Sequence, residues 1–191
     1  MKAEYRNIID RRYCTDEANM IRWQKTLCFV EGSPLADTKV GSRAASGLDL
    51  GDRTPLCDDL ERLFGCPFAS TGCDLDLDPL SGSYDVVTAF EVLEHLFNPL
   101  HALLEVRKVL AGPHARLFVS VPAAKPAMLK SPDHFHEMSP SELDSLIRRA
   151  GFSSIRSGSF RIRRWPFYLT GLKPLLRAFH EKVLIHELRQ A

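Results

Sequence analysis

Short apolar runs alternate with longer amphipathic stretches between residues 46 and 160, and this alternation constrains the fold more than any other feature. The stretches between the runs repeat apolar residues at helical spacing. Strands that alternate with helices predict a three-layer α/β fold, in which a mostly parallel sheet is covered by helices on both faces. The runs with the length and composition of buried strands are 47–51, 68–73, 84–90 and 116–121.

The predicted helices carry recognisable start and stop signals. Three of them begin at or next to a proline, whose missing N–H is tolerated in a first turn: 55–64, 100–110 and a helix that starts after Ser139. Ser139 and Glu142 have the spacing of a capping box, and Gly151 is placed to end that helix. These signals support the helical half of the alternation.

The two flanks of this region differ from it. Residues 1–45 carry helical periodicity without a strand signal, which predicts a helical N-terminal extension to the α/β domain of 46–160. Residues 161–191 are cationic and rich in aromatic and aliphatic side chains, and we expect them to complete the domain. Their first part, 161–182, is typical of a lid, a partner contact or a peripheral membrane contact. The run 183–188 is either a last strand or a helical end.

Composition excludes several function classes. The chain has 191 residues, and its 25 lysines and arginines balance 24 acidic residues, which does not favour nucleic-acid binding. No run approaches the roughly 18 apolar residues of a membrane helix, and no signal peptide is evident. The five cysteines never form C-x-x-C, so we expect reduced thiols and a cytoplasmic protein. Nothing in the sequence indicates an oligomeric state.

Small and acidic residues stand at the predicted carboxyl ends of the strands, where ligands bind in open α/β sheets. Asp49 and Gly51 end the first strand, Asp74 follows the second, and Ala89 with Phe90 ends the third. Glycine lets a ligand approach the backbone, and a carboxylate accepts hydrogen bonds from ribose hydroxyls. These residues favour a nucleoside site, but ordinary turn formation explains them equally well.

The stretch from Ser83 to Leu96, SYDVVTAFEVLEHL, is the most specific motif in the chain. Together with Leu48-Asp49-Leu50-Gly51 and Asp74, it resembles the class I S-adenosylmethionine-dependent methyltransferases. The likeness is to the small-molecule branch, whose sequences read "fDvv…vlEHl", and it extends over roughly residues 46–160. It implies a Rossmann-like fold, S-adenosylmethionine as cofactor and a small-molecule substrate.

The resemblance also implies roles for individual residues. The loop 51–53 would lie under the methionine part of the cofactor, and Asp74 would hold the ribose. Glu94 and His95 fall at the mouth of the substrate side, where His95 is the first candidate for a general base. The implied cofactor-binding residues are Asp49, Gly51, Asp52, Arg53, Asp74, Leu75, Ala89, Phe90 and Glu91, and the implied catalytic residues are His95 and Glu94.

Two substitutions depart from the family pattern in the loop after the first strand. The family loop usually carries three glycines, and here Arg53 and Pro55 occupy the second and third places. Arg53 brings a long cation to a position where the backbone should approach a zwitterionic ligand. Its side chain either pairs with the cofactor carboxylate or fills the pocket.

The link between Asp76 and Tyr84 is a larger departure, because the family normally has a helix, a strand and another helix there. Only residues 77–83 remain, whereas a parallel crossover normally takes a dozen or more residues. About seven extended residues reach roughly 25 Å, and stepping over one neighbouring strand needs about 20 Å. An extended link fits and a helical one does not. We therefore predict that the third strand is absent and that the adenine side is unusually open.

Two functions from different classes are compatible with these sequence features. The first is S-adenosylmethionine-dependent methyl transfer to a small-molecule, lipid-like or saccharide acceptor. The second is a catalytically degenerate relative that uses the same sheet for binding or for partner contacts, and Arg53, Pro55 and the short link favour it. A nicotinamide dehydrogenase is excluded because no G-x-G-x-x-G occurs near Gly51.

Metal binding is not expected from the spacing of the possible ligands. Asp74, Asp76 and Asp78 have the spacing of a calcium loop, but Pro79 replaces the glycine that such a loop needs. The run Asp133-His134-Phe135-His136-Glu137 and the pair Glu94-His95 could also supply metal ligands, and His134 and His136 would share one side of an extended segment. The resemblance explains them as part of a loop on the substrate side, so the predicted site contains no metal.

Overall fold

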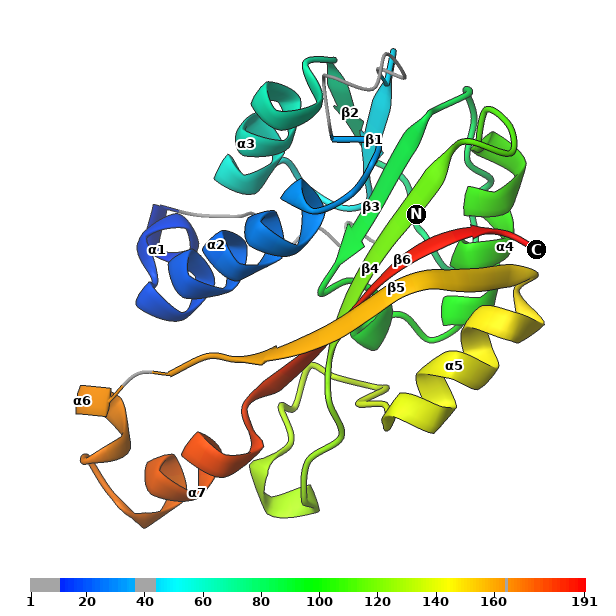
Figure 1. The fold of residues 1–191 in the computed structure, drawn as a ribbon. Coiled ribbons are helices and arrows are strands. Elements are labelled where there is room, and N and C mark those ends of the chain that lie inside the picture. Colours follow the sequence, from blue (N-terminus) through cyan, green and yellow to red (C-terminus); the bar gives the residue numbers. More distant parts are fainter. Residues whose placement is uncertain (1–10, 37–43, 164) are drawn as a thin grey trace, which may run out of the picture.

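The computed structural model describes residues 11–36, 44–163 and 165–191, and the rest of the predicted N-terminal extension lies outside these ranges. Helices and strands alternate along the chain (Figure 1). In order they are α1 (Arg11–Thr15), α2 (Glu17–Glu31), β1 (Gly47–Asp49), α3 (Pro55–Phe64), β2 (Phe68–Ser70), β3 (Val86–Phe90), the 3-10 turn η1 (Leu93–His95), α4 (Pro99–Val109), β4 (Arg116–Pro122), the 3-10 turn η2 (Ala127–Leu129), α5 (Pro140–Arg149), β5 (Phe152–Arg161), α6 (Trp165–Tyr168), α7 (Leu172–His180) and β6 (Lys182–Gln190).

The strands of the described residues form one six-stranded sheet in the order β2-β1-β3-β4-β6-β5. The pairs β1–β2, β1–β3 and β3–β4 are parallel, whereas β6 runs antiparallel to both β4 and β5. The run 183–188, which the sequence left open between strand and helix, is therefore the central part of a strand. The predicted α/β class with a mostly parallel sheet is confirmed.

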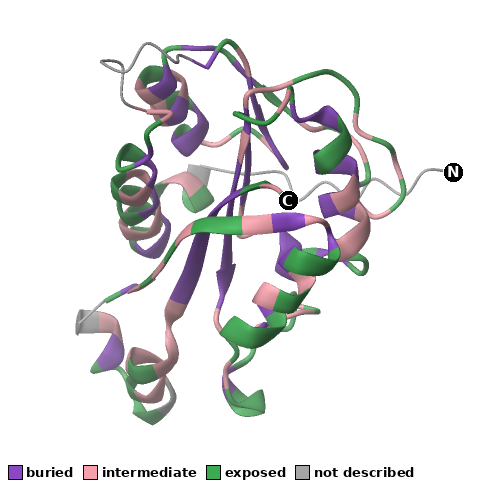
Figure 2. Cartoon of the chain, turned by 45° about the vertical axis from the view of Figure 1, so that its right-hand side comes forward, coloured by how far each residue is buried: buried purple, intermediate pink, exposed green. Residues whose placement is uncertain are grey.

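Helices cover both faces of the sheet, as the alternation predicted. α2 and α3 lie on one face, and α4 and α5 lie on the other (Figure 1). Successive strand residues point to opposite faces, so Val86 and Phe118 join the core under α2 and α3, whereas Val87 and Val119 join the core under α4 and α5. Figure 2 shows the same division, because the central strands are buried and the outer sides of the helices are exposed.

The helix signals of the sequence are found where they were expected. Ser139 and Glu142 form a capping box at the start of α5, and Asn98 accepts a hydrogen bond from the backbone N–H of His101 in α4. Gly65 ends α3 with a positive φ of 64°, which favours glycine. No helix in the described part of the chain is long and apolar enough to span a membrane.

The third strand is absent, as the length of the link predicted. Residues 71–83, all of them described, contain turns but no strand. Leu75 is buried in the core beneath α4, and Leu80 packs against the same core. The backbone N–H of Leu80 also donates a hydrogen bond to Glu105 of that helix. These contacts hold the short crossover against the sheet domain. β2, itself shorter than predicted, becomes one edge of the sheet.

A buried carboxylate on β6 connects three parts of the fold. Glu187 accepts a hydrogen bond from Ser33 Oγ at 2.6 Å, just beyond α2, and another from Arg156 Nε on β5 at 3.0 Å. Arg116 Nε on β4 lies 3.8 Å from the same carboxylate. Arg156 also donates to the carbonyl of Phe29 and lies over its ring. The end of α2 is fixed to the sheet by this network.

Candidate functional site

The carboxyl end of β1 carries a buried acid, Asp49, and is followed by Gly51, whose positive φ favours glycine. Asp49 is buried and accepts a hydrogen bond from Thr88 Oγ1 at 2.5 Å. Burial raises the pKa of Asp49 to about 7, although the bond from Thr88 and the charge of Arg53 oppose the shift. Gly51 follows with a φ of +103°, and its N–H donates to Thr71 Oγ1 at 2.7 Å.

The space beside Gly51 suits the close approach of a ligand. A Cβ at this position would meet only Val92 Cγ2, at 4.0 Å. The next helix, α3, begins at Pro55 without a side-chain hydrogen bond from its N-cap residue Thr54. Amide groups of an uncapped first turn attract anionic groups. In this turn Pro55 has no N–H and the N–H of Cys57 donates to the carbonyl of Thr54, so the loop offers mainly the open surface beside Gly51.

Arg53 points toward α3 and its neighbouring strand. Its guanidinium donates to Asp58 Oδ1 at 2.5 Å, to Glu61 Oε2 at 2.7 Å and to the carbonyl of Phe68 at 3.3 Å. These contacts satisfy its charge within the chain. Contact between Arg53 and a cofactor remains a prediction, and it requires some of these bonds to be exchanged.

The acidic residues after β2 have separate environments. Asp74 is exposed, and its Oδ1 accepts a hydrogen bond from the backbone N–H of Asp76 at 3.0 Å. The Asp76 carboxylate instead accepts from the backbone N–H groups of Phe97 and Asn98, at 3.1 and 2.7 Å. Asp76 thus holds the short link against the start of α4, a role that sequence reasoning missed. Leu75, between the two acids, is buried.

The end of β3 places a strained acid next to the sheet. Ala89 is buried and Phe90 is half-buried. Glu91 is the one non-glycine residue with positive φ, at 55°, among those the structure describes. Its carboxylate accepts from Ser120 Oγ at 3.0 Å and lies 3.4 Å from Arg22 Nε on α2. Such strain is typical of functional sites, and the contact brings the N-terminal helices to this edge of the sheet.

The side chain of Glu94 is fully buried beside this acid. Its side chain is 1% exposed, and neither carboxylate oxygen has a hydrogen-bond partner among the described residues. Burial raises the pKa of Glu94 well above its usual value, and the negative charge of Glu91 raises it further. A buried carboxylate without partners is costly, so this residue requires an explanation beyond packing.

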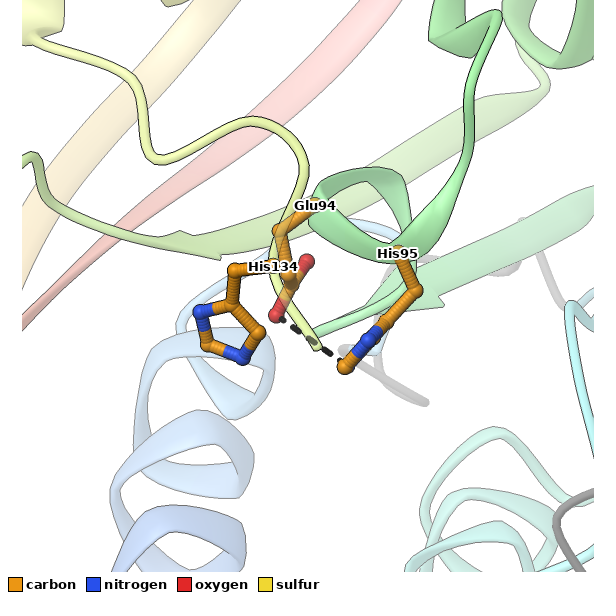
Figure 3. A group of neighbouring side chains, drawn as sticks. All are labelled: Glu94, His95 and His134. Carbon is orange, nitrogen blue, oxygen red and sulfur yellow. Dashed lines mark ion pairs between the residues drawn. The ribbon is translucent and has the colours of Figure 1, made fainter. Parts of the chain in front are cut away.

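Two histidines lie against Glu94 (Figure 3). His95 Nε2 is 4.0 Å from Glu94 Oε1, and the ring of His134 meets the ring of His95 almost at right angles, with 4.9 Å between centroids. His134 comes from the loop after β4. That loop is fixed in place because the backbone N–H groups of Phe135 and His136 donate to the carbonyl of Glu94.

Each of these histidines has a partner at its other ring nitrogen. His95 Nδ1 lies 2.9 Å from the carbonyl oxygen of Asp133, and His134 Nδ1 lies 3.0 Å from Glu137 Oε1. The buried Glu137 also binds Lys125 Nζ at 2.9 Å. Burial alone would raise the pKa of Glu137, but Lys125 and His134 lower it. Burial lowers the pKa of His134, which favours its neutral form.

The structure thus brings together some of the predicted residues and adds others. Glu94 and His95 lie side by side, and Glu91 is close enough for its charge to act on Glu94. Sequence reasoning missed two further partners from distant segments, Arg22 and Lys125, and it named Glu137 only among possible metal ligands. His136 does not join the group, because its Nε2 lies 3.3 Å from the carbonyl oxygen of Phe97. The only available sequence signal was the cluster of histidines and acids at 133–137.

A family model described as "Methyltransferase domain" matches residues 22–157. This chain belongs to that methyltransferase family. The resemblance to class I S-adenosylmethionine-dependent methyltransferases is confirmed, and the match covers β1, β3 and the histidine loop. No curated protein sequence matches the chain.

Solved structures of methyltransferases share the fold at low sequence identity. The N-methyltransferase NodS from Bradyrhizobium japonicum, in complex with S-adenosyl-L-homocysteine, has a TM-score of 0.57 and 14% identity, with 98% of this chain and 94% of that chain covered. The complex of the Haloferax volcanii Trm112 methyltransferase activator with a methyltransferase has a TM-score of 0.59 and 15% identity, with 91% of this chain and 94% of that chain covered. A Burkholderia thailandensis 1,6-didemethyltoxoflavin-N1-methyltransferase has a TM-score of 0.51 and 14% identity, with 92% of this chain and 87% of that chain covered.

Proposed function

We propose that this protein is an S-adenosylmethionine-dependent methyltransferase that acts on a small-molecule, lipid-like or saccharide acceptor. The observation that carries the proposal is the match of the methyltransferase family across residues 22–157, which include the carboxyl ends of β1 and β3. Similar structures contain S-adenosylhomocysteine, such as those of NodS and the toxoflavin methyltransferase. They support the cofactor, whereas the acceptor class rests on the resemblance of the SYDVVTAFEVLEHL motif.

The residues at the strand ends fit such a cofactor. The open side of Gly51 suits the close approach of the methionine part of the cofactor. Asp74 is exposed and offers a carboxylate to the ribose hydroxyls. The half-buried Phe90 would border the adenine, whereas the side chain of Ala89 is buried in the core beneath it. When bound, S-adenosylmethionine supplies an activated methyl group on a sulfonium. These assignments remain proposals for Asp49, Gly51, Asp52, Arg53, Asp74, Leu75, Ala89, Phe90 and Glu91.

Methyl transfer mainly requires that donor and acceptor are aligned and that water is excluded. Arg22 on α2 reaches Glu91, so the N-terminal helices are placed to cover the acceptor side. His95 is 42% exposed at its side chain and is the candidate to accept a proton from the acceptor. The three-part division of the chain and a lid formed by 161–182 remain predictions. Exposed Leu169, Leu172 and Phe179 would give such a lid an apolar surface.

Calorimetric titration with S-adenosylhomocysteine tests this proposal. We expect binding to the parent protein and a loss of about 1–3 kcal/mol of binding free energy in Asp74→Ala, because a charged acceptor is removed. Asp144→Ala on α5 is the matched control and should bind like the parent. Equal affinity of Asp74→Ala and the parent would show that the ribose assignment is wrong.

A non-catalytic relative is the second candidate function, and the environment of Arg53 favours it. The guanidinium is held by Asp58 and Glu61, and no second or third glycine is present in the loop. A protein of this kind would use the sheet for binding or partner contacts. No detectable heat with millimolar S-adenosylhomocysteine, from protein shown to be folded by circular dichroism, would support this candidate and exclude the methyltransferase.

A further inference from the structure

Glu94, His95 and His134 present ligand atoms toward one small volume (Figure 3). One carboxylate oxygen and one ring nitrogen from each histidine all lie within 4.8 Å of one another. Ligands about 2.1 Å from a tetrahedral ion are about 3.4 Å apart. Side-chain rotations that close the widest separation by up to about 1.4 Å would therefore bring the three atoms to bonding distance of one ion.

A carboxylate buried as deeply as that of Glu94 is stable in its ionised form only beside a cation. Both oxygens of Glu94 are buried without hydrogen-bond partners among the described residues. The nearby cations are engaged elsewhere: Arg22 lies against Glu91, and Lys125 is bound to Glu137. A bound metal ion would supply the missing charge. This observation is independent of the proximity of the two histidines.

The hydrogen bonds of the histidines direct their remaining nitrogens toward the same volume. A carbonyl oxygen only accepts, so the contact with Asp133 places the proton of His95 on Nδ1 and leaves a lone pair on Nε2. Glu137 fixes His134 in the same way through Nδ1. Metal-binding histidines are usually oriented by such a carbonyl or carboxylate partner. Lys125 in turn holds Glu137 in position.

We propose that Glu94, His95 and His134 bind one divalent transition-metal ion of the zinc type. Two imidazoles with one carboxylate suit such an ion, whereas magnesium and calcium prefer oxygen ligands. Spacing along the sequence predicted no metal, because the third ligand reaches the site only through the fold of the loop after β4. Three protein ligands leave a position open for another molecule.

The open position gives the ion a role, and this role rests on the proposed function. It lies at the end of β3, on the side assigned to the acceptor. With Nδ1 on the Asp133 carbonyl and Nε2 on the ion, His95 could not also act as the base, so an acceptor hydroxyl bound there would lose its proton to water instead. Its oxygen would then form the bond to the methyl carbon while the carbon–sulfur bond breaks and its electron pair stays on sulfur. The products are a methyl ether, S-adenosylhomocysteine and a hydrated proton.

Titration of chelator-treated, dialysed full-length protein with Zn²⁺ alone tests the site, with Co²⁺ absorption as a second readout. We expect one ion per chain, and visible absorption bands typical of Co²⁺ with a low coordination number. His95→Ala and His134→Ala should each lose at least tenfold in affinity. His136→Ala is the matched control, because that histidine lies two residues from His134 with its Nε2 turned to Phe97, and it should bind like the parent.

Two more variants separate ligation from folding. Glu94→Gln retains the shape of the side chain without its charge, and we expect it to fold and to lose at least tenfold in Zn²⁺ affinity. Glu137→Gln should lose about 10–100-fold, since it orients His134 without touching the ion. No Zn²⁺ binding by the parent, or equal affinities of His95→Ala and His136→Ala, would overturn the proposal.

The outcome for the metal is distinct from the outcome for the cofactor. Zn²⁺ binding without any heat from S-adenosylhomocysteine would overturn the proposed function and support the metal site. Binding of S-adenosylhomocysteine with no Zn²⁺ or Co²⁺ binding would support the proposed function and overturn the metal site. The two titrations are therefore run separately on the same preparation.

Discussion

Replacing Glu187 by alanine is expected to lower the free energy of unfolding by about 3–5 kcal/mol. The buried carboxylate accepts hydrogen bonds from Ser33 and Arg156 and lies near Arg116. Its removal leaves two guanidinium groups close together without their shared anion. Ser33, just beyond α2, also loses its hydrogen bond to β6. Urea unfolding followed by circular dichroism measures the loss.

Matched variants show whether the loss of stability in Glu187→Ala comes from this network or would follow the removal of any acidic side chain. Glu31→Ala removes an exposed carboxylate at the end of α2 and should change the free energy of unfolding by less than about 0.5 kcal/mol. Arg156→Ala should also be strongly destabilising, because it removes the bonds to Glu187 and Phe29. A loss below about 1 kcal/mol in Glu187→Ala would contradict our interpretation of this network.

At pH 8, Asp49→Asn is expected to be more stable than the parent by up to about 4 kcal/mol. Burial raises the pKa of Asp49 from 3.8 to about 7. Between these two values the folded protein binds more protons than the unfolded chain, so its stability falls as pH rises. Each pH unit of the interval contributes about 1.4 kcal/mol. Asparagine has no charge to bury and retains an acceptor for Thr88.

The pH dependence is the decisive part of this prediction. The advantage of Asp49→Asn should be small near pH 4 and reach its full size above pH 7, as measured by urea unfolding at both values. Asp52→Asn, in the half-buried loop that follows, is the control and should change the free energy of unfolding by less than about 0.5 kcal/mol. The same advantage at both pH values would show that packing, not ionisation, is responsible.

An acid that costs the folded state stability is typical of a functional position, because selection retains it for a role that stability does not explain. Asp49 lies at the end of β1, where the resemblance assigned it to the cofactor. The same reasoning applies to Glu94, whose carboxylate is buried without partners among the described residues. Two acids whose burial destabilises the folded state, Asp49 after β1 and Glu94 after β3, indicate a functional site at the carboxyl ends of these strands more clearly than the glycine pattern does.

The sheet domain was largely predictable because its elements carry local signals. Buried runs and proline or serine helix starts identified β1, β3, β4 and three helices before any contact was known. The absence of the third strand followed from the reach of seven residues. β5 was missed because its side chains are mostly polar and alternate between half-buried and exposed. Its pairing with β6, rather than any local pattern, makes it a strand.

The candidate site was predictable only where its residues are close in sequence. Glu91, Glu94 and His95 fall within one motif, and their proximity follows from the turn after β3. Their contacts with Arg22, His134 and Lys125 depend on α2 and on the loop after β4. Spacing along the chain contains no information on such contacts, because packing between distant segments sets them. Sequence reasoning therefore grouped only the residues that are close along the chain, and its expectation of a site without metal is the opposite of our proposal, which the Zn²⁺ titration decides.

The position of β6 between β4 and β5 sets the order in which the protein can fold during synthesis. β5 leaves the ribosome before β6, yet its ladder in the sheet is formed with β6 alone. Until residues 182–190 emerge, β4 has an unpaired edge and β5 has no partner. Unpaired edges of this kind favour association with other chains. We therefore expect nascent chains that stop before β6 to be the species of this protein that most need chaperones.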